Sequence, residues 1–230
     1  MIKIHENITQ GSDEWLDLRC GILTASEMQK IITPTLKAAN NDETRSHLYE
    51  LAAQRISKYV EPSYISDDML RGHEDECYAK MHYANHYAEV KEVGFITNDK
   101  WGFKIGFSPD GLVGDDGFIE VKSRRQKYQI ETILSGGMPE NKKINCALQI
   151  QTGFLVSERK WCDFISYHGG LPMVTYRIYP DNEVMAAIEQ AAIEFEAKLR
   201  DVVEKYQDIL SKQQSRFVQT ERVIREEISI

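Results

Sequence analysis

The segment SPDGLVGDDGFIEVKS (108–123) has Asp110 after a proline, a turn rich in Gly and Asp, and then Glu120 and Lys122 among apolar residues. Glu120 and Lys122 stand two positions apart in an apolar run, and residues two apart share one face of a β-strand. With the glycine-rich turn centred near Asp115, Asp110 is expected opposite Glu120 to within one register step. Side chains of neighbouring strands meet at such positions. The sequence therefore predicts one small patch of sheet that carries all three charged groups.

Two ionised carboxylates at that distance repel each other, so the patch needs a compensating positive charge. Lys122 supplies one, and a hard divalent cation such as Mg²⁺ or Mn²⁺ suits carboxylate oxygens better. Such a cation can hold a phosphate oxygen, activate a water and stabilise a leaving oxygen. The lysine would then orient the water or help to remove its proton. A plain surface salt bridge, with Asp110 as a turn residue, is the alternative, and spacing alone does not separate the two.

Local patterns predict the elements that position this segment. Residues 11–15 begin a short helix with Ser12 as its cap, and TASE at 24–27 has the capping-box pattern that opens a second helix. Alternating apolar residues predict strands at 101–107, 109–113, 118–123, 161–168 and 173–179. Helical periodicity predicts helices at 42–60, 67–87, 125–134, 141–157 and from 181 onward.

The order of these elements predicts a mixed α/β core, with a mixed central β-sheet flanked by helices. A single core can grow to about this length, so residues 1–212 are expected to form one domain, with 213–230 as a C-terminal tail or helix. The apolar stripe from Ile188 to Tyr206 is expected to pack on the sheet, and a subunit contact is its alternative role.

Composition limits the class of protein. No run approaches the roughly 18 apolar residues that span a membrane, and the polar N-terminus has no signal-peptide core. Four scattered cysteines without a CxxC pair favour a reduced, cytoplasmic chain. The net charge of −8 argues against a chain-wide electrostatic attraction to nucleic acid, although it permits a local basic groove.

Six short motifs stand in an order and at intervals that point to one family. PD at 109–110 and EVK at 120–122 match the PD-(D/E)xK nuclease signature. The other segments are GSDEWLDLR (11–19), LTASE (23–27), RGHEDE (71–76) and ALQIQ (147–151). Together they resemble the lambda-exonuclease, or YqaJ-like viral recombinase, family of alkaline exonucleases. The resemblance implies the PD-(D/E)xK restriction-endonuclease-like fold.

The resemblance also implies a metal site. Asp110 matches the aspartate that bridges the metals, Glu120 matches the second ligand, and the Val121 backbone carbonyl completes the protein shell. Lys122 matches the lysine that positions the nucleophilic water. Glu76 matches the glutamate of a G-x-x-x-E helix motif that helps to shape the site.

Further residues match positions that contact the site or the DNA. Gln149 matches the first glutamine of a Q-x-Q helix, whereas Gln151, the second, is interpreted as structural. Arg19, Ser26 and Ser108 match positions that bind the terminal 5′ phosphate. The family's basic residue after E-x-K does not align cleanly. Candidates for this contact or for a DNA channel are Arg124, Arg125, Lys127, Lys142 and Lys143.

The implied activity is a metal-dependent 5′→3′ exonuclease that degrades one strand of linear double-stranded DNA and leaves 3′ single-stranded tails. The implied cofactor is Mg²⁺ at a two-metal site, with Mn²⁺ as a substitute. A single-strand annealing protein and a homotrimeric ring around DNA are the implied partner and assembly. The implied setting is the cytoplasm of a bacterial host, with a phage or prophage origin.

Three alternatives remain open at this point. The chain is an endonuclease of the restriction or resolvase type, or a non-catalytic subunit that binds DNA ends, or a zinc-dependent hydrolase that uses His82 and His86. The intact Asp110, Glu120 and Lys122 set speaks against the second. The missing HExxH glutamate and third ligand speak against the third. His73, inside RGHEDE, is interpreted as a core or solvated histidine, with metal ligation as its alternative.

Overall fold

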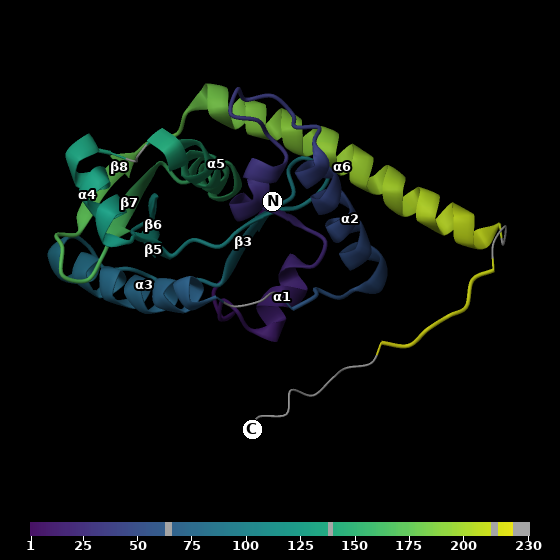
Figure 1. Ribbon diagram of the computed structural model, residues 1–230, viewed down its shortest axis with the longest axis horizontal. Helices are drawn as coiled ribbons and strands as arrows, with labels where there is room; N and C mark the ends of the chain where they lie inside the picture. Colours follow the sequence, from purple (N-terminus) through teal and green to yellow (C-terminus); the bar gives the residue numbers. More distant parts are fainter. Residues whose placement is uncertain (63–65, 138–139, 213–215, 223–230) are drawn as a thin grey trace.

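A computed structural model describes residues 1–62, 66–137, 140–212 and 216–222, with only the backbone described for 140–144. Its strands form two four-stranded sheets surrounded by helices (Figure 1). The first sheet has the order β1 (Ile2–His5), β3 (Phe95–Asn98), β4 (Ile105–Phe107) and β2 (Leu23–Thr24). The second has the order β5 (Gly111–Val113), β6 (Gly117–Ser123), β7 (Trp161–Tyr167) and β8 (Val174–Ile178).

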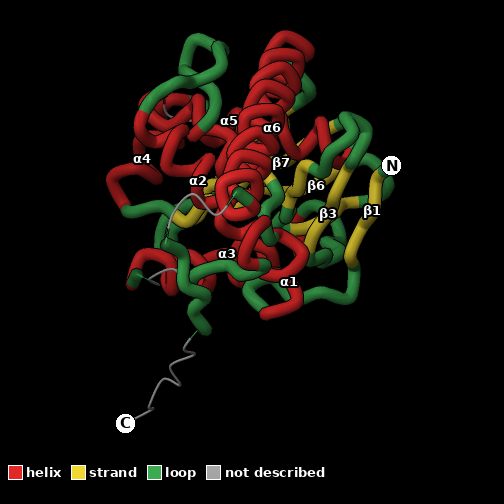
Figure 2. Tube along the Cα trace, turned by 90° about the vertical axis from the view of Figure 1, so that its right-hand side faces the viewer, coloured by secondary structure: helices red, strands yellow, loops and turns green. Residues whose placement is uncertain are grey.

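The helices are α1 (Asp13–Arg19), the 3₁₀ helix η1 (Ala25–Lys30), α2 (Asp42–Ser57), α3 (Asp67–His86), α4 (Gln126–Ser135), α5 (Glu140–Ser157) and α6 (Asn182–Ser211). The predicted α/β class is confirmed, and the strands are divided between two mixed sheets. Figure 2 shows β1 beside β3 at the edge of the molecule, near the N-terminus. No helix of the described residues is long and apolar enough to cross a membrane.

The hairpin of β5 and β6 has the register that the sequence predicts. Gly111 pairs with Ile119 in antiparallel fashion, so Asp110 and Glu120 are the next residues along their strands. On its other side β6 pairs in parallel with β7, and Glu120 stands beside Phe164. Glu120 is therefore held in the interior of the sheet.

The two faces of β6 pack on different helices. Phe118, on the same face as Glu120, makes edge contacts with Phe107 and with Phe154 of α5. On the opposite face, Ile119 belongs to a buried cluster with Tyr83 of α3. Each buried aromatic or aliphatic side chain contributes about 1.5–3 kcal/mol, so apolar packing on both faces fixes the strand.

The stripe on α6 packs on helices and not on the sheet, which corrects the sequence-based expectation. Ile188 and Leu199 are fully buried, and the principal contacts of α6 are with α2 and α5. Arg55 of α2 adds a two-pronged ion pair to Glu196 of α6, with N–O distances of 2.8 and 2.7 Å. Further along α6, Tyr206 is 44% exposed and lines a groove with Tyr49 and Ile56 of α2, and the end of α6 extends past α2 (Figure 1).

Two local predictions were wrong, the start of the strand at 101–107 and the capping box at 24–27. A turn explains the first and a side-chain hydrogen bond explains the second. The predicted strand 101–107 exists only from Ile105, because a turn from Asp99 to Gly102 occupies its start and Gly102 has a φ of 78°. The segment at 24–27 forms a 3₁₀ helix without a side-chain cap. The Thr24 hydroxyl bonds to the Glu27 carboxylate in place of the backbone.

The remaining elements agree with the sequence in position and type. Ser12 caps α1 by accepting from the backbone N–H of Trp15. Helix α2 ends at Ser57 because Lys58 adopts the left-handed conformation. Strands β1, β2 and β3 were not predicted. Residues 216–222 of the C-terminal segment are exposed and carry no regular secondary structure, whereas 213–215 and 223–230 lie outside the described residues.

Candidate active site

The centre of the candidate site is a hydrogen-bonded triangle on β6 and α5. The Glu120 side chain is 1% exposed, and its Oε1 accepts from Lys122 Nζ at 2.6 Å and from Gln149 Nε2 at 2.7 Å. Lys122 Nζ also donates to Gln149 Oε1 at 3.2 Å. Each side chain therefore contacts the other two. The structure brings together three of the residues that the sequence singles out.

Asp110 joins this group through the backbone. Its Oδ2 accepts from the Val121 N–H at 2.5 Å, which fixes the carboxylate beside β6. Glu120 Oε2 is buried and has no hydrogen-bond partner among the described residues. A buried polar oxygen without a partner is costly, so this atom is where a cation or water is expected to bind. Carboxylate oxygens of this kind suit a hard divalent cation.

The electrostatics of the site agree with that interpretation. Burial, together with the nearby Glu120 and Glu76, holds the pKa of Asp110 well above its ordinary value. Burial also raises the pKa of Glu120, against the opposing effect of Lys122. Burial alone would lower the pKa of the Lys122 ammonium, but Glu120 and other neighbours raise it. An ammonium held in this way orients a water more readily than it removes a proton.

Glu76 lies on α3, at the wall of a cleft of about 620 Å³ that Asp110 also lines. Its carboxylate pairs with Lys80 Nζ at 2.7 Å, and Lys80 also reaches Glu92 at 3.3 Å. His73 lines the same cleft. The helix thus brings Glu76 to the side of the site that opens to solvent.

The three candidate phosphate residues are connected through two residues that the sequence did not single out. The Arg19 guanidinium lies over the Trp15 ring at 4.1 Å, and Trp15 Nε1 donates to Ser108 Oγ at 3.0 Å. Arg19 Nη2 donates to Thr24 Oγ1 at 3.4 Å, and Thr24 lies 3.3 Å from Ser26 Oγ. Trp15 and Thr24 stand inside the motifs GSDEW and LTASE, which was the available signal.

Gln151 has the structural contacts that were expected of it. Its Nε2 donates to the Tyr179 carbonyl at 3.0 Å, and its Oε1 accepts from the Asp181 N–H at 2.8 Å. These bonds connect α5 to the loop before α6. Gln149, two residues earlier, points to Glu120 instead.

The basic residues after Lys122 differ in exposure. Arg124 is buried, whereas Arg125 and Lys127 are exposed. Arg125 pairs with Asp68 at the start of α3 at 2.7 Å. Burial makes Arg124 the least accessible of the three to DNA. The side chains of Lys142 and Lys143 lie outside the described residues.

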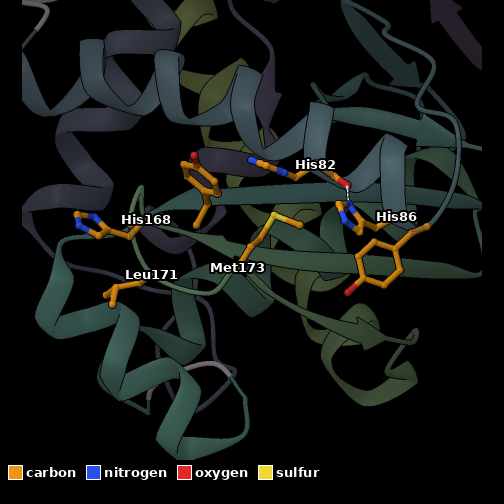
Figure 3. Close-up of a pocket in the computed structure, with 8 residues that line it drawn as sticks. His82, His86, His168, Leu171 and Met173 are labelled. Atoms are coloured by element: carbon orange, nitrogen blue, oxygen red, sulfur yellow. Dashed lines mark hydrogen bonds between the residues drawn. The ribbon is translucent and has the colours of Figure 1, made fainter.

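His82 and His86 line a separate pocket of about 290 Å³ together with His168 (Figure 3). His86 Nδ1 is bonded to the His82 carbonyl at 2.8 Å, and His168 Nδ1 to the Arg124 carbonyl at 2.7 Å. The three rings do not bring their nitrogens together, since the described residues contain a single three-ligand cluster, at Glu27, His47 and Glu50. The histidine pair therefore gains no third ligand here.

The fold is a mixed α/β arrangement of two sheets and surrounding helices, which solved exonuclease structures share. The YqaJ-like viral recombinase domain matches residues 14–160, and the chain belongs to that family. A comparison with curated proteins gave no match.

Solved structures agree with this assignment. The alkaline exonuclease LHK-Exo from Laribacter hongkongensis is similar at 32% identity, with a TM-score of 0.76, over 87% of this chain and 99% of that one. LHK-Exo in complex with dAMP gives a TM-score of 0.77 at the same identity and coverage. A phage-related exonuclease from Haemophilus somnus shares the fold at 14% identity, with a TM-score of 0.60 over 80% of this chain and 96% of that one. The family and these matches support a DNA-hydrolysing nuclease.

The raised pKa of Asp110 leads to a stability prediction for the metal-free protein. A carboxyl whose pKa is raised by folding stabilises the fold while protonated, and that contribution is lost as pH rises through the raised pKa. Asp110→Asn removes the charge at every pH and keeps an oxygen for the Val121 N–H. At pH 8 with chelator, we expect Asp110→Asn to raise Tm by about 2–4 °C, the shift that about 1 kcal/mol produces in a chain of this size.

Calorimetric scans at pH 8 and pH 4 measure this effect. The gain should shrink toward pH 4, where the wild-type carboxyl is protonated. Asp115→Asn, in the exposed turn between β5 and β6, is the matched control and should change Tm little at either pH. A lower Tm for Asp110→Asn at pH 8 would show that the buried charge is already compensated.

Proposed function

We propose that the chain is a metal-dependent 5′→3′ exonuclease that degrades one strand of linear duplex DNA and leaves 3′ single-stranded tails. The observation that carries the proposal is the buried Glu120 carboxylate, which has one oxygen without a hydrogen-bond partner among the described residues and lies beside the half-buried Asp110 carboxyl group. Two carboxylates are brought into one interior patch against their mutual repulsion. A site that binds cations explains that arrangement, whereas a surface salt bridge does not.

Asp110, Glu120, the Val121 carbonyl and Glu76 are the residues that would hold the cations, as a two-metal Mg²⁺ site in which Mn²⁺ substitutes. When bound, the ions supply Lewis acidity, an activated water and stabilisation of the leaving oxygen. Hard oxygen donors of this kind fit both ions. The salt bridge between Glu76 and Lys80 leaves the second Glu76 oxygen for this role.

Lys122 and Gln149 act on the attacking water and on the position of the carboxylate. Gln149 accepts from Lys122 and donates to Glu120, so it sets the distance between the ammonium and the carboxylate. Lys122 is 32% exposed, which allows its ammonium to contact a water at the edge of the site. Its raised pKa favours a role in orienting that water.

Arg19, Ser26 and Ser108 are proposed to bind the 5′ phosphate of the strand that is degraded. Arginine suits a phosphate because its planar guanidinium donates two parallel, charge-assisted bonds. Arg19 lies over the face of the Trp15 ring, and Ser108 accepts a hydrogen bond from the N–H of the same ring, so Trp15 connects the two residues. Binding of the 5′ phosphate at this position would make degradation begin at the 5′ end of the strand, which is the proposed 5′→3′ direction.

The proposed assembly is a homotrimeric ring around DNA, in a bacterial host cell and of phage or prophage origin, with a single-strand annealing protein as partner. A chain with net charge −8 attracts a polyanion weakly at long range, and DNA affinity falls with salt. A closed ring retains the duplex topologically. An apolar groove of about 710 Å³ between α2 and α6, lined by Tyr49, Ile56 and Tyr206, offers apolar surface for a subunit contact.

Loss of either the Asp110 or the Glu120 carboxylate is expected to abolish cleavage. Asp110→Asn and Glu120→Gln keep the side-chain size but weaken the anionic shell, and Lys122→Ala should lower the rate by several orders of magnitude. The assay is digestion of end-labelled linear duplex with Mg²⁺, with chelator and with Mn²⁺ add-back. Asp115→Asn should cleave normally.

Closed-circular duplex should resist digestion, and its cleavage would favour the endonuclease alternative. Asp110→Asn turnover near the wild-type rate would eliminate the proposed mechanism.

Arg19→Ala is expected to remove the preference for a phosphorylated end. One charge-assisted contact is worth about 1.5–3 kcal/mol, or roughly a factor of ten to a hundred in rate. The loss should appear with 5′-phosphorylated duplex and be small with 5′-hydroxyl duplex. Arg45→Ala, an exposed arginine of α2 paired with Asp42, is the control. Equal losses on both substrates would make Arg19 a structural residue.

The ring predicts the mass of the protein in solution. Light scattering in the tens-of-micromolar range should give close to three times the monomer mass of 26.5 kDa. Digestion in the presence of excess trap DNA should also continue along a strand once it has begun, because a closed ring does not dissociate sideways. A monomer mass, with digestion that the trap halts after a few nucleotides, would contradict the ring.

A further inference from the structure

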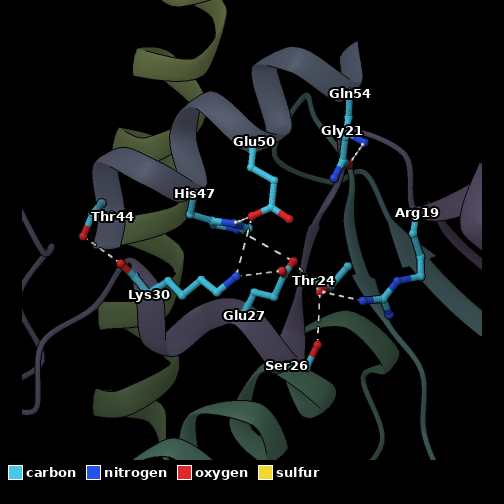
Figure 4. Close-up of polar contacts among 10 residues, drawn as sticks. All are labelled: Arg19, Gly21, Thr24, Ser26, Glu27, Lys30, Thr44, His47, Glu50 and Gln54. Carbon is cyan, nitrogen blue, oxygen red and sulfur yellow. Dashed lines mark hydrogen bonds and ion pairs between the residues drawn. The ribbon is translucent and has the colours of Figure 1, made fainter. Parts of the chain in front are cut away.

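A chain of polar contacts runs behind the proposed phosphate residues, and two of its members, Thr24 and His47, are buried (Figure 4). It begins at Thr24, which is 2% exposed and lies in the motif LTASE that also carries Ser26. Arg19 Nη2 donates to Thr24 Oγ1 at 3.4 Å, and Ser26 Oγ lies 3.3 Å from the same oxygen. Thr24 Oγ1 in turn donates to Glu27 Oε2 at 3.1 Å. One hydroxyl thus contacts both candidate phosphate ligands and a carboxylate.

The direction of these bonds is fixed by the chemistry of the groups. An ionised carboxylate only accepts hydrogen bonds, and a hydroxyl has a single proton. The Thr24 proton is therefore committed to Glu27, and the lone pairs of Thr24 Oγ1 face Arg19 and Ser26. Glu27 thereby makes Thr24 an acceptor toward the guanidinium and holds that guanidinium in place.

Glu27 is itself held by the next elements. Lys30 Nζ donates to Glu27 Oε1 at 3.1 Å, and His47 Nε2 lies 3.7 Å from Glu27 Oε2. His47 of α2 is 1% exposed, stacks on Phe195 of α6 with ring centroids 5.6 Å apart, and bonds through Nδ1 to Glu50 at 2.9 Å. The carboxylate position is thus tied to α2 and α6.

The charge of Glu27 is balanced inside the cluster. Burial tends to raise the pKa of Glu27, but His47 and Lys30 lower it below its ordinary value, so the side chain is a carboxylate. The ligand atoms of Glu27, His47 and Glu50 lie within 4.8 Å of one another, a spacing that also suits a metal. Lys30, 3.1 Å from Glu27 and 3.7 Å from Glu50, already supplies the positive charge. Lys30 thus ties the two carboxylates together, while His47 Nε2 stays buried without a hydrogen-bond partner among the described residues.

We propose that Thr24 and Glu27 are positioning residues that fix Arg19 and Ser26 for the 5′ phosphate. The proposal rests on the proposed role of Arg19 and Ser26 as phosphate ligands. Neither positioning residue needs to touch the DNA. Their effect should therefore appear in discrimination between phosphorylated and hydroxyl ends, and not in cleavage itself.

The test compares kcat/KM for 5′-phosphorylated and 5′-hydroxyl linear duplex. Thr24→Val keeps the shape and removes the hydroxyl, and we expect the ratio to fall roughly threefold to tenfold, as one lost hydrogen bond produces. Glu27→Gln should also lower the ratio, because its amide can donate to Thr24 and free the hydroxyl proton. Thr24→Ser should restore the wild-type ratio. Thr132→Val, which removes another buried threonine hydroxyl bonded only to a helix carbonyl, is the control.

Each outcome has a definite meaning. A lower ratio in Thr24→Val, with the ratio kept in Thr24→Ser and Thr132→Val, supports the positioning role. Equal losses on both substrates, or an unchanged ratio, overturn it, and Thr24→Val decides if Glu27→Gln fails to fold. If Arg19→Ala lowers the ratio while Thr24→Val and Glu27→Gln do not, only the positioning role is wrong. If Arg19→Ala also leaves the ratio intact, the phosphate site itself is wrong and both proposals fall.

Discussion

A carboxylate buried in the middle of a sheet constrains everything around it. Glu120 sits on β6 between two neighbouring strands, and one of its oxygens accepts from both Lys122 and Gln149. Removing that carboxylate from water costs several kcal/mol unless charge and hydrogen bonds compensate. Three features of the fold keep these compensating groups within contact distance of Glu120. They are the register of the hairpin, the apolar packing on both faces of β6 and the placement of α5.

The positive groups among the named residues do not fully neutralise the carboxylates of the site. This excess of negative charge is what suits the site to bind a cation. Three carboxylates, on Asp110, Glu120 and Glu76, face two ammonium groups, on Lys122 and Lys80. The excess is negative, and it lies partly in the interior. By contrast, the cluster around Glu27 behind the phosphate residues places Lys30 and the His47 ring directly against the carboxylates of Glu27 and Glu50. The molecule therefore has one polar cluster suited to recruit cations and another suited to hold side chains still.

The sequence predicts the parts of this site that depend on local spacing. The i, i+2 relation of Glu120 and Lys122 and the turn before them determine the hairpin and the position of Asp110. Local patterns do not predict contacts made across the fold. Trp15 reaches Ser108 over 93 positions, and His47 reaches Phe195 on a helix from the other end of the chain. The capping-box prediction at Thr24 failed for a local reason, since the Thr24 hydroxyl bonds to the Glu27 side chain three residues later and not to the backbone.

The claim that Asp110 and Glu120 bind the metal is tested most directly by locating the bound ion. Crystals soaked in Mn²⁺ give anomalous scattering peaks that identify its ligands without reference to activity. We expect the strongest peak at Glu120 Oε2 and Asp110, and no peak at the cluster of Glu27, His47 and Glu50, where Lys30 already provides the positive charge. A strong peak at that cluster, with none at Asp110 and Glu120, would contradict the assignment of the buried carboxylates as the metal site.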